Sequence, residues 1–409
     1  MRNDCFLPAE ILLPHDIDMQ KWAVVAVDQF TGDFSYWENL KAFVGDGKST
    51  LNLVLPEIYL NGDTAARIAN INENIDSYLS SGVFTATEEG FILTVRKTPF
   101  VDRRIGLIGK IDLERYEYSS KSDALIRSTE GTIEERIPPR LKIRKDAKAE
   151  FTHAMILFDD EKREITEKLY ENREKYKKLY DFTLNFGGGS IEGYFIPKDE
   201  PILKRFDSLL DEDRLIKKYG KADEFLFAVG DGNHSLATAK AHWNAVKSGL
   251  SESEKNDHPA RYALVEAVNI YDEGIYFEPI YRFVSGVDTV KFTDGLKKLN
   301  ADFGVYADKK TEKFCVGATL PSSITAVDDY IKEYIGKNGG AVDYIHGERE
   351  IKEMVDKDGS SVAILFDKME KGDLFRFVSE KGSLPRKTFS MGQGVEKRYY
   401  LEGRKIVKE

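Results

Sequence analysis

The segment FLFAVGDGNHSLATAKAHW, residues 225–243, constrains the fold more than any other part of the chain. Its apolar run has the length of a buried strand and ends at Gly-Asp-Gly, where glycine permits a tight turn. From Leu236 to Val246, apolar residues then recur at helical spacing and would share one buried face. A strand, a turn and a helix therefore follow one another here, and polar residues gather at the junction.

The same alternation of short apolar runs with amphipathic stretches continues along the chain, and it predicts an α+β (mixed α/β) fold. The periodicity and the Gly and Pro positions define each element. We expect strands at 22–27 and 49–56, helices at 33–45 and 63–82, a strand pair at 90–99 and 104–113, a long charged helix at 161–182, and a hairpin of core strands at 261–272 and 274–284.

The length of the chain predicts more than one subdomain. Its 409 residues exceed what one ordinary core accommodates, and a hydrophobic content of 41% can fill cores of that size. We expect an N-terminal mixed α/β domain at 1–150 and a C-terminal α/β domain at 151–409 that carries the glycine turn. Because no long Pro- or Ser-rich linker separates them, the two are expected to be tightly packed or interleaved.

Charge and cysteine content argue against several classes of protein. A formal net charge of −10 disfavours a broad nucleic-acid surface. The two cysteines, Cys5 and Cys315, form no CxxC pair, which argues against a disulfide scaffold. There is no apolar run of about 18 residues for a membrane span and no signal-peptide pattern. We expect a cytoplasmic protein without membrane or nucleic-acid partners, and a homodimer stays open.

Gly-Asp-Gly occurs twice, and the two copies have different surroundings. The first, in VGDGKSTLN at 44–52, has the Gly-Lys-Ser of a phosphate loop, but Ala42 stands where that loop needs another glycine. A helix precedes it and a strand is expected to follow, so we interpret it as a helix C-cap and turn. The second copy has the strand-to-helix order that a phosphate site requires.

The second turn brings together groups that suit an anion. The free N–H groups and the positive end of the following helix would converge there, most obviously on a phosphate. His234 could donate a proton or a hydrogen bond, and Asp231 could bind a metal or accept a substrate proton. Alternatively, Asp231 and Asn233 cap the helix, and His234 is a satisfied half-buried residue. The candidate phosphate-binding residues are Gly230, Gly232, Asn233 and Ser235.

Three further stretches combine charged residues with the ends of expected elements. They are residues 125–147, 277–282 and 384–392, and their side chains could clasp a phosphate or a carboxylate. The alternative interpretations are a fully solvated loop for 125–147 and a basic surface turn for 384–392. We expect these stretches and Asp231–His234 to meet in one cleft. The candidates are Arg127, Glu130, Arg136, Glu278, Arg282, Arg386 and Lys387.

The string GDGNHSLATAK resembles the Asp-Gly-X-His signature of the domain of unknown function 1015 family. Other blocks of that family have counterparts in the same order along nearly the whole chain. Among them are KWAVVAVDQF, LIRSTEGTIEERIPPRLKIR and LPRKTFSMG. Much of the family has a second histidine in place of Asn233 and an arginine in place of Ser235. A role that rests on that arginine would fall to another basic residue, such as Arg282 or Arg386.

The turn also resembles the phosphate-binding turn of the ParB/sulfiredoxin-like fold. That fold includes nucleotide-binding partition proteins and kinases of free serine, in which the turn holds nucleotide phosphates. The resemblance implies that ATP or ADP, together with Mg²⁺, binds at Gly230–Ser235. Sulfiredoxin chemistry is excluded, because it needs a cysteine where Asn233 stands.

Three functions remain open. A nucleotide-dependent phosphotransferase for a small polar metabolite would use Arg282, Arg386 and Lys387 to neutralise charge, since phosphoryl transfer depends on positioning and charge neutralisation. Its base would be Asp28, Asp231 or Glu130. A non-catalytic nucleotide or metabolite sensor is the alternative. A metal-dependent hydrolase with His234 and Asp231 comes third, because the six histidines show no zinc-site spacing.

Overall fold

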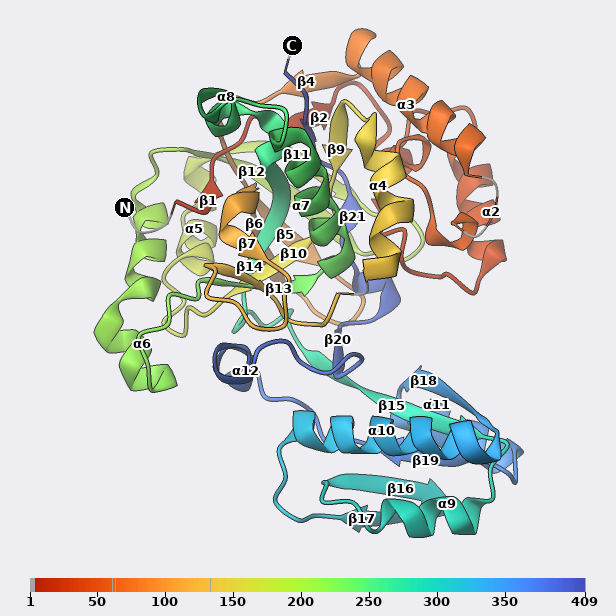
Figure 1. Ribbon diagram of the computed structural model, residues 1–409. Coiled ribbons are helices and arrows are strands. Elements are labelled where there is room, and N and C mark those ends of the chain that lie inside the picture. Colours follow the sequence, from red (N-terminus) through yellow and green to blue (C-terminus); the bar gives the residue numbers. More distant parts are fainter. Residues whose placement is uncertain (1–3, 61, 63, 133, 409) are drawn as a thin grey trace. The chain divides into compact units, whose positions relative to one another are not determined.

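The computed structural model describes residues 4–60, 62, 64–132 and 134–408. The chain divides into two compact units (Figure 1): unit 1 comprises Met1–Ile275 and Gln393–Glu409, and unit 2 comprises Tyr276–Gly392. Unit 2 is thus inserted into the sequence of unit 1. The domain boundary expected at residue 150 lies inside unit 1, because one sheet takes strands from both sides of it.

That sheet is mixed and has ten strands among the described residues of unit 1. Most neighbours along it are antiparallel, but β14–β10, β13–β8 and β8–β7 are parallel pairs. β1 (Phe6–Leu7) pairs with β6 outside the main order. The order is β11 (Lys177–Thr183), β12 (Ser190–Pro197), β5 (Gly90–Lys97), β6 (Arg104–Asp112), β14 (Tyr262–Asn269), β10 (Met155–Phe158), β13 (Phe227–Asp231), β8 (Ile126–Ser128) and β7 (Tyr116–Glu117).

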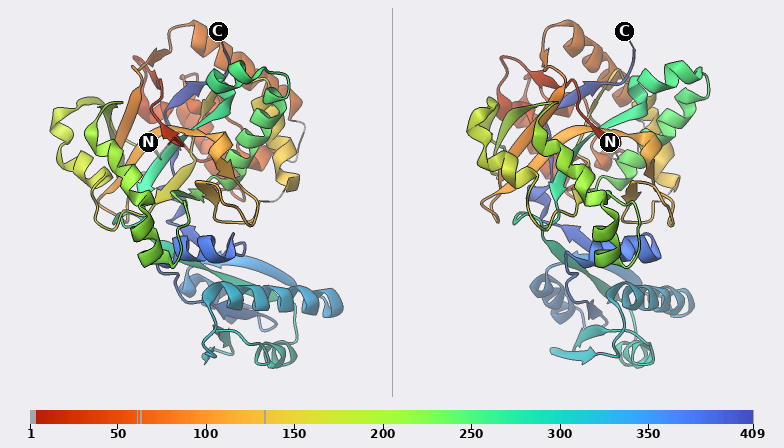
Figure 2. Two further views of the ribbon diagram at one scale, coloured as in Figure 1. Left: turned by 60° about the vertical axis from the view of Figure 1, so that its left-hand side comes forward. Right: turned by 90° about the vertical axis from the view of Figure 1, so that its left-hand side faces the viewer.

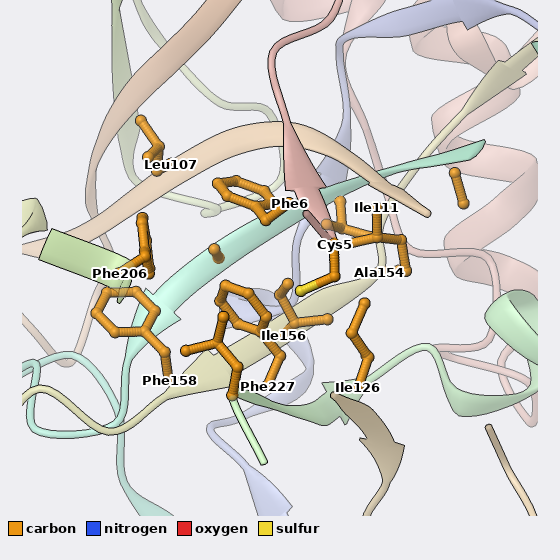
Figure 3. Close-up of a cluster of buried hydrophobic side chains, with 14 of the residues drawn as sticks. Cys5, Phe6, Leu107, Ile111, Ile126, Ala154, Ile156, Phe158, Phe206 and Phe227 are labelled. Carbon is orange, nitrogen blue, oxygen red and sulfur yellow. The ribbon is translucent and has the colours of Figure 1, made fainter. Parts of the chain in front are cut away.

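Both faces of this sheet are covered by apolar cores. Because successive side chains of a strand point to opposite faces, Leu93 of β5 joins one core cluster and the adjacent Ile92 joins the other. Figure 3 shows part of the first cluster, where Phe227 of β13 packs against Phe6 and Phe206 with ring centroids 5.5 and 5.6 Å apart. The strand that leads to the glycine turn is therefore anchored in the core.

Unit 1 also contains two small sheets and eight helices in its described part. The views in Figures 1 and 2 show helices on both sides of the main sheet. No helix in the described ranges is long and apolar enough to cross a membrane. The small sheets are β4 (Phe84–Ala86), β2 (Leu12–Pro14), β22 (Gly403–Lys405) and β9 (Ala149–Phe151), and β21 (Tyr399–Tyr400) with β3 (Val24–Val25). The helices are α1 (Met19–Trp22), α2 (Phe34–Val44), α3 (Ala65–Ser80), α4 (Ile137–Lys145), α5 (Thr166–Glu171), α6 (Glu212–Tyr219), α7 (Asn233–Lys247) and α8 (Glu252–Asp257).

Unit 2 is a separate α+β body with its own core. Val284, Val305 and Ile364 of its sheet pack against Ile324 and Val327 of α10, which lies along the sheet in Figure 1. Its main sheet runs β17 (Lys310–Phe314), β16 (Phe303–Ala307), β19 (Val362–Leu365), β15 (Phe277–Ser285) and β18 (Ala341–His346), and β20 (Phe389–Met391) also pairs with β15. The helices are α9 (Thr289–Leu296), α10 (Leu320–Asn338), α11 (Glu348–Lys357) and α12 (Asp373–Lys381).

The mixed α+β class is confirmed, as are the helices at 33–45 and 63–82 and the strand pair of β5 with β6. The strand expected at 49–56 is wrong. That segment begins with a 3₁₀ turn at Thr50–Asn52, because the Ser49 side chain accepts from the N–H of Leu51 and the Thr50 hydroxyl donates to the carbonyl oxygen of Trp22.

Two longer elements also differ from expectation. The charged helix at 161–182 ends after α5, where the Asn172 side chain bonds back to the carbonyl oxygen of Lys168, and the chain continues as the charged edge strand β11. The hairpin at 261–284 is wrong as well. β14 pairs with β6 and β10 in unit 1, whereas β15 pairs with β18, β19 and β20 in unit 2, so the two strands do not pair with each other.

Candidate functional site

The junction at Gly230–Ser235 has the local structure that the sequence predicts. β13 ends at Asp231, and α7 begins at Asn233. Gly232, between them, has φ +80°, and a Cβ there would lie 2.9 Å from the Cα of Ala154. Both the left-handed backbone and the close approach of the neighbouring chain therefore require glycine at this position.

The N-cap residue of α7 is Gly232, which has no side chain with which to cap the helix. The two expected caps have other partners. Oδ1 of Asp231 accepts from the N–H of Gly232 at 3.0 Å, and Oδ1 of Asn233 lies 2.6 Å from the Ser128 hydroxyl, which donates to it. The first N–H groups of a helix have no partner within the helix. The start of α7 therefore offers backbone donors to an anion.

The two faces of α7 differ as the helical spacing predicts. Leu236, Ala239 and Trp243 are buried in the first apolar core. His234 and Ser235 are half-buried and belong to neither apolar cluster of unit 1. Because His234 is only half-buried, it is not a fully buried core residue, and its role as a ligand contact stays a prediction.

A lysine outside the predicted set, Lys397, lies beside this junction. Its Nζ is 3.1 Å from Oδ2 of Asp231, and the two side chains are only 10% and 17% exposed. Charges that are largely shielded from water interact more strongly than charges on an open surface. A poorly solvated ammonium group thus lies next to the residues that precede α7.

Buried arginines hold the backbone that carries Lys397. Arg96 of β5 donates to the carbonyl oxygens of Val395 (2.9 Å) and Lys397 (2.5 Å). The carbonyl oxygen of Glu396 accepts from both Arg96 (3.1 Å) and Arg104 of β6 (3.0 Å). Burial, together with the neighbouring Arg104, lowers the pKa of Arg96 to about 9, so the guanidinium stays charged at neutral pH. The main sheet therefore fixes a segment that follows unit 2 in the sequence.

Asp28, a predicted base, lies near the same lysine. Its Oδ2 is 4.0 Å from Nε2 of His153, and its Oδ1 accepts from Nε2 of Gln29 at 3.2 Å. Burial opposes the charged carboxylate, but the charges of His153 and Lys397 outweigh burial and lower the pKa of Asp28. Asp28 is therefore ionised at neutral pH. We call Asp28, His153, Asp231 and Lys397 the acid–base cluster.

Tyr400 and Arg140 border the acid–base cluster. The ring of Tyr400 meets the ring of His153 edge-on, with centroids 5.1 Å apart. Burial and the nearby Asp28 raise the pKa of Tyr400, so its hydroxyl stays protonated. Arg140 forms an ion pair with Glu57. The cluster thus has one neutral neighbour, Tyr400, and one cationic neighbour, Arg140, which lies within reach of the charge of Asp28.

Of the other predicted residues in unit 1, Arg127 is a structural residue. Its Nη1 and Nη2 donate to Asp223 at 2.8 and 2.5 Å, and the two side chains are 4% and 9% exposed. Glu130 is half-buried, and its carbonyl oxygen accepts from the Ser128 hydroxyl at 2.7 Å. Arg136 is exposed. Residues 126–130 lie beside the junction, because β8 pairs with β13.

Arg282 of unit 2 is also committed to the fold. It is fully buried, and its Nε and Nη2 each donate to Asp328 at 2.8 Å. Nη1 donates to the carbonyl oxygens of Ile280 (2.6 Å) and Lys387 (2.9 Å), and Nη2 also reaches that of Arg386 (3.4 Å). With its nitrogens used in this way, Arg282 has no surface to offer a phosphate. The expectation that it neutralises substrate charge is not favoured.

The remaining predicted residues of unit 2 lie close to Arg282. Glu278 of β15 is half-buried and stands opposite Ser390 of β20. Arg386 and Lys387 are exposed. The four predicted segments therefore meet in two pairs, one inside each unit. The expectation that all four share one site stays a prediction.

The fit of a metal ion can be judged from the acidic side chains. In the described part of the chain, no group of three or more His, Cys, Asp or Glu residues could hold a metal. Both oxygens of Asp231 already have protein partners, Gly232 N–H and Lys397 Nζ. Each carboxylate oxygen can accept a second partner, so Asp231 could contribute an oxygen to Mg²⁺ while it stays paired with Lys397. Protein sites for Mg²⁺ often provide one or two carboxylates, and phosphates of the substrate complete the coordination.

The sequence matches the family described as "Protein of unknown function (DUF1015)" over residues 11–353. No curated protein matches it. One similar solved structure is a substituted free serine kinase in complex with AMP, with 10% identity over 76% of this chain and 98% of that chain and a TM-score of 0.41. A conserved hypothetical protein from Pyrococcus furiosus has 10% identity over 71% and 92% of the two chains and a TM-score of 0.36. C-terminally truncated SbnI from Staphylococcus aureus has 8% identity over 70% and 82% and a TM-score of 0.36. These likenesses are too distant to assign an activity.

Proposed function

Because the chain belongs to the DUF1015 family, whose function is unknown, we propose an activity from its own residues. Unit 1 binds the phosphates of a nucleotide, ATP or ADP, at the start of α7 and transfers a phosphoryl group to a small polar metabolite. The observation that carries this proposal is the ion pair of Lys397 with Asp231 beside a helix start whose N-cap residue is glycine.

Phosphate binding follows from the charges around the turn. A helix start provides N–H donors and the positive end of the helix dipole, and α7 is 15 residues long. Lys397 has three N–H donors, of which one suffices for Asp231, so the others remain for phosphate oxygens. Gly232 lets the backbone approach closely, since it carries no side chain between the ligand and the turn.

Phosphoryl transfer requires positioning and charge neutralisation more than strong covalent chemistry. In the proposed reaction, the acceptor hydroxyl oxygen bonds to the γ-phosphorus of ATP while the bond from that phosphorus to the ADP oxygen breaks, and ADP leaves with the electron pair. Asp28, which its lowered pKa keeps ionised, orients the hydroxyl and accepts its proton. Lys397 and the α7 N–H groups stabilise the charge on the transferred phosphoryl group. Mg²⁺, when bound, would neutralise charge on the phosphates, and Asp231 is the carboxylate best placed to reach it.

Nucleotide binding and nucleotide consumption test the two parts of the proposal separately. Binding of ATP, ADP and AMP with and without Mg²⁺ would be measured by calorimetry and by the shift in melting temperature, and consumption by phosphorus NMR with a panel of small hydroxylated metabolites. Lys397→Met should weaken ATP binding by about tenfold or more, since a charged hydrogen bond contributes about 1.5–3 kcal/mol. Lys198→Met is the control, because Lys198 is 60% exposed and pairs with Glu89.

Two further variants locate the site and separate an enzyme from a sensor. His234→Ala should reduce ligand-dependent stabilisation with little change in the melting temperature of the free protein, because His234 is outside the cores. Asp231→Asn should abolish consumption in an enzyme and preserve binding in a sensor. If the wild-type protein binds no nucleotide at saturating concentration, the proposal is wrong.

A further inference from the structure

Four aromatic side chains of unit 1 form a group of ring contacts that we call the aromatic patch. It consists of Phe30, Tyr36, Phe43 and Phe186. Phe30 and Tyr36 are stacked, with centroids 4.1 Å apart. Phe186 meets Tyr36 at 5.5 Å and Phe43 at 5.8 Å, both edge-on. Because these rings come from three separate segments, the folded chain brings them together.

Burial alone does not account for the aromatic patch. Phe43 and Phe186 are 37% and 38% exposed, among the few large apolar side chains that the described structure leaves open to solvent. Phe30 and Phe186 have φ of +52° and +48°. Bulky residues rarely adopt this left-handed conformation, and such outliers gather at functional sites. The fold holds these rings at the surface in an unfavourable backbone conformation, which suggests that they contact a ligand.

The aromatic patch adjoins the acid–base cluster. Phe30 follows Asp28 by two residues, and Gln29 between them donates to the Asp28 carboxylate. On the other side, a Cβ on Gly394 would lie 3.3 Å from the ring of Phe30, so that ring packs against the segment that leads to Lys397. Lys21 adds a cation at the far edge, with its Nζ 6.0 Å from the centroid of the Phe43 ring.

We propose that the aromatic patch stacks against the base of the nucleotide whose phosphates bind at the start of α7. A nucleotide joins a planar base to an anionic group, and this surface joins aromatic rings to Lys397 and helix N–H groups. Bases stack on aromatic side chains through their π faces. Phe186 is 38% exposed, so part of this side chain is open to a ligand. This inference rests on the proposed function and assigns the base-binding part of the same site.

Calorimetry with ATP and with inorganic triphosphate separates the base from the phosphates. Phe186→Ala should weaken ATP binding about tenfold, equivalent to about 1.4 kcal/mol, and leave triphosphate binding unchanged. Phe100→Ala is the matched control, since Phe100 is an exposed phenylalanine of unit 1 at 60% and should change neither. Phe186→Leu, which keeps an apolar side chain without the ring, should also weaken ATP binding. The melting temperature of each free variant verifies that it folds.

The outcomes are distinct. If wild-type protein binds ATP and triphosphate equally tightly, or if Phe186→Leu binds ATP as the wild type does, base stacking is overturned and phosphate binding stands. The second result would show that ATP binding does not need the ring of Phe186. If wild-type protein binds neither ligand, the proposed function fails, and base stacking fails with it.

Discussion

Gly232 is the residue on which the candidate site depends most directly. Gly232→Val should lower the free energy of unfolding by more than about 3 kcal/mol, because valine is strained at positive φ and its Cβ would meet the backbone of Ala154. Gly220→Val is the control. Gly220 has φ +79°, but a Cβ at this position would have nothing within 4 Å, so the variant carries only the conformational cost, about 1–3 kcal/mol.

Urea denaturation of both variants measures the difference. Equal losses of stability would show that the close approach at Ala154 costs nothing, and the account of the turn given above would be wrong. The sequence alone predicts a turn at this glycine, because the apolar strand before it and the helical spacing after it are local signals.

The sequence identifies two residues of the acid–base cluster and misses the other two. Asp28 and Asp231 follow apolar runs, which marks them as strand-end carboxylates. His153 and Lys397 reach the cluster only through pairing between distant segments, as in β21 with β3. Arg282 shows the converse: a basic residue at a strand end looks like an anion ligand, yet its hydrogen bonds to Asp328 make it structural.

At the scale of elements, the contact between β5 and the segment 393–398 decides whether the site is assembled. Arg96→Met would leave several buried carbonyl oxygens, including those of Val395 and Lys397, without their donor. We expect the unfolding free energy to fall by about 3 kcal/mol or more, because an unpaired buried polar group costs about 1–3 kcal/mol. Nucleotide binding should weaken as well, since Lys397 loses its support.

Arg103→Met is the control for this variant. Arg103 directly precedes β6, and it makes a 3.9 Å contact with the exposed Glu273 and lies over the ring of Tyr170. Such contacts contribute little, so its loss should cost about 1 kcal/mol or less. Chemical denaturation and calorimetry on both variants give the comparison. A stable Arg96→Met protein with normal nucleotide affinity would contradict the role of Arg96.

Helices in which apolar residues recur at helical spacing could be predicted from the sequence. Strands whose neighbours in the sheet are far away in the sequence could not. α2, α3 and α7 carry their own apolar face. β11 carries the lysines of an exposed edge strand. In the sequence these charges look like the solvated face of a helix, so the sequence predicts a helix there. β14 and β15 are both apolar strands separated by a short turn, and only their different sheets show that they are not a hairpin.

At the scale of the whole molecule, His242 makes stability depend on pH. Burial, with the charge of Arg144, lowers the pKa of His242 to about 4. The unfolded chain binds this proton below a pH of about 6.5, whereas the folded chain does not, so stability present at pH 7 is lost as the pH falls. Between pH 7 and pH 5 the loss from His242 should be about 2 kcal/mol.

Replacing His242 separates its contribution to the pH dependence of stability from the contributions of other groups, some of which have the opposite sign. Burial raises the pKa of Asp272 to about 6, so the folded chain keeps a proton that the unfolded chain releases, and that contribution falls as the pH rises. Denaturation at pH 7 and pH 5 should therefore show a smaller pH effect in His242→Gln than in the wild type.

The division into units could not be predicted from composition, because no linker-like stretch marks residues 275 and 393. The insertion has a consequence for biosynthesis. A ribosome makes the chain from its N-terminus, so all of unit 2 is synthesised before Lys397. Until then Arg96 and Arg104 have no carbonyl oxygens of segment 393–398 to bind, and β3 has no β21 beside it. A nucleotide that needs Lys397 would thus bind only chains that extend past this residue, and it would stabilise completed chains over nascent ones.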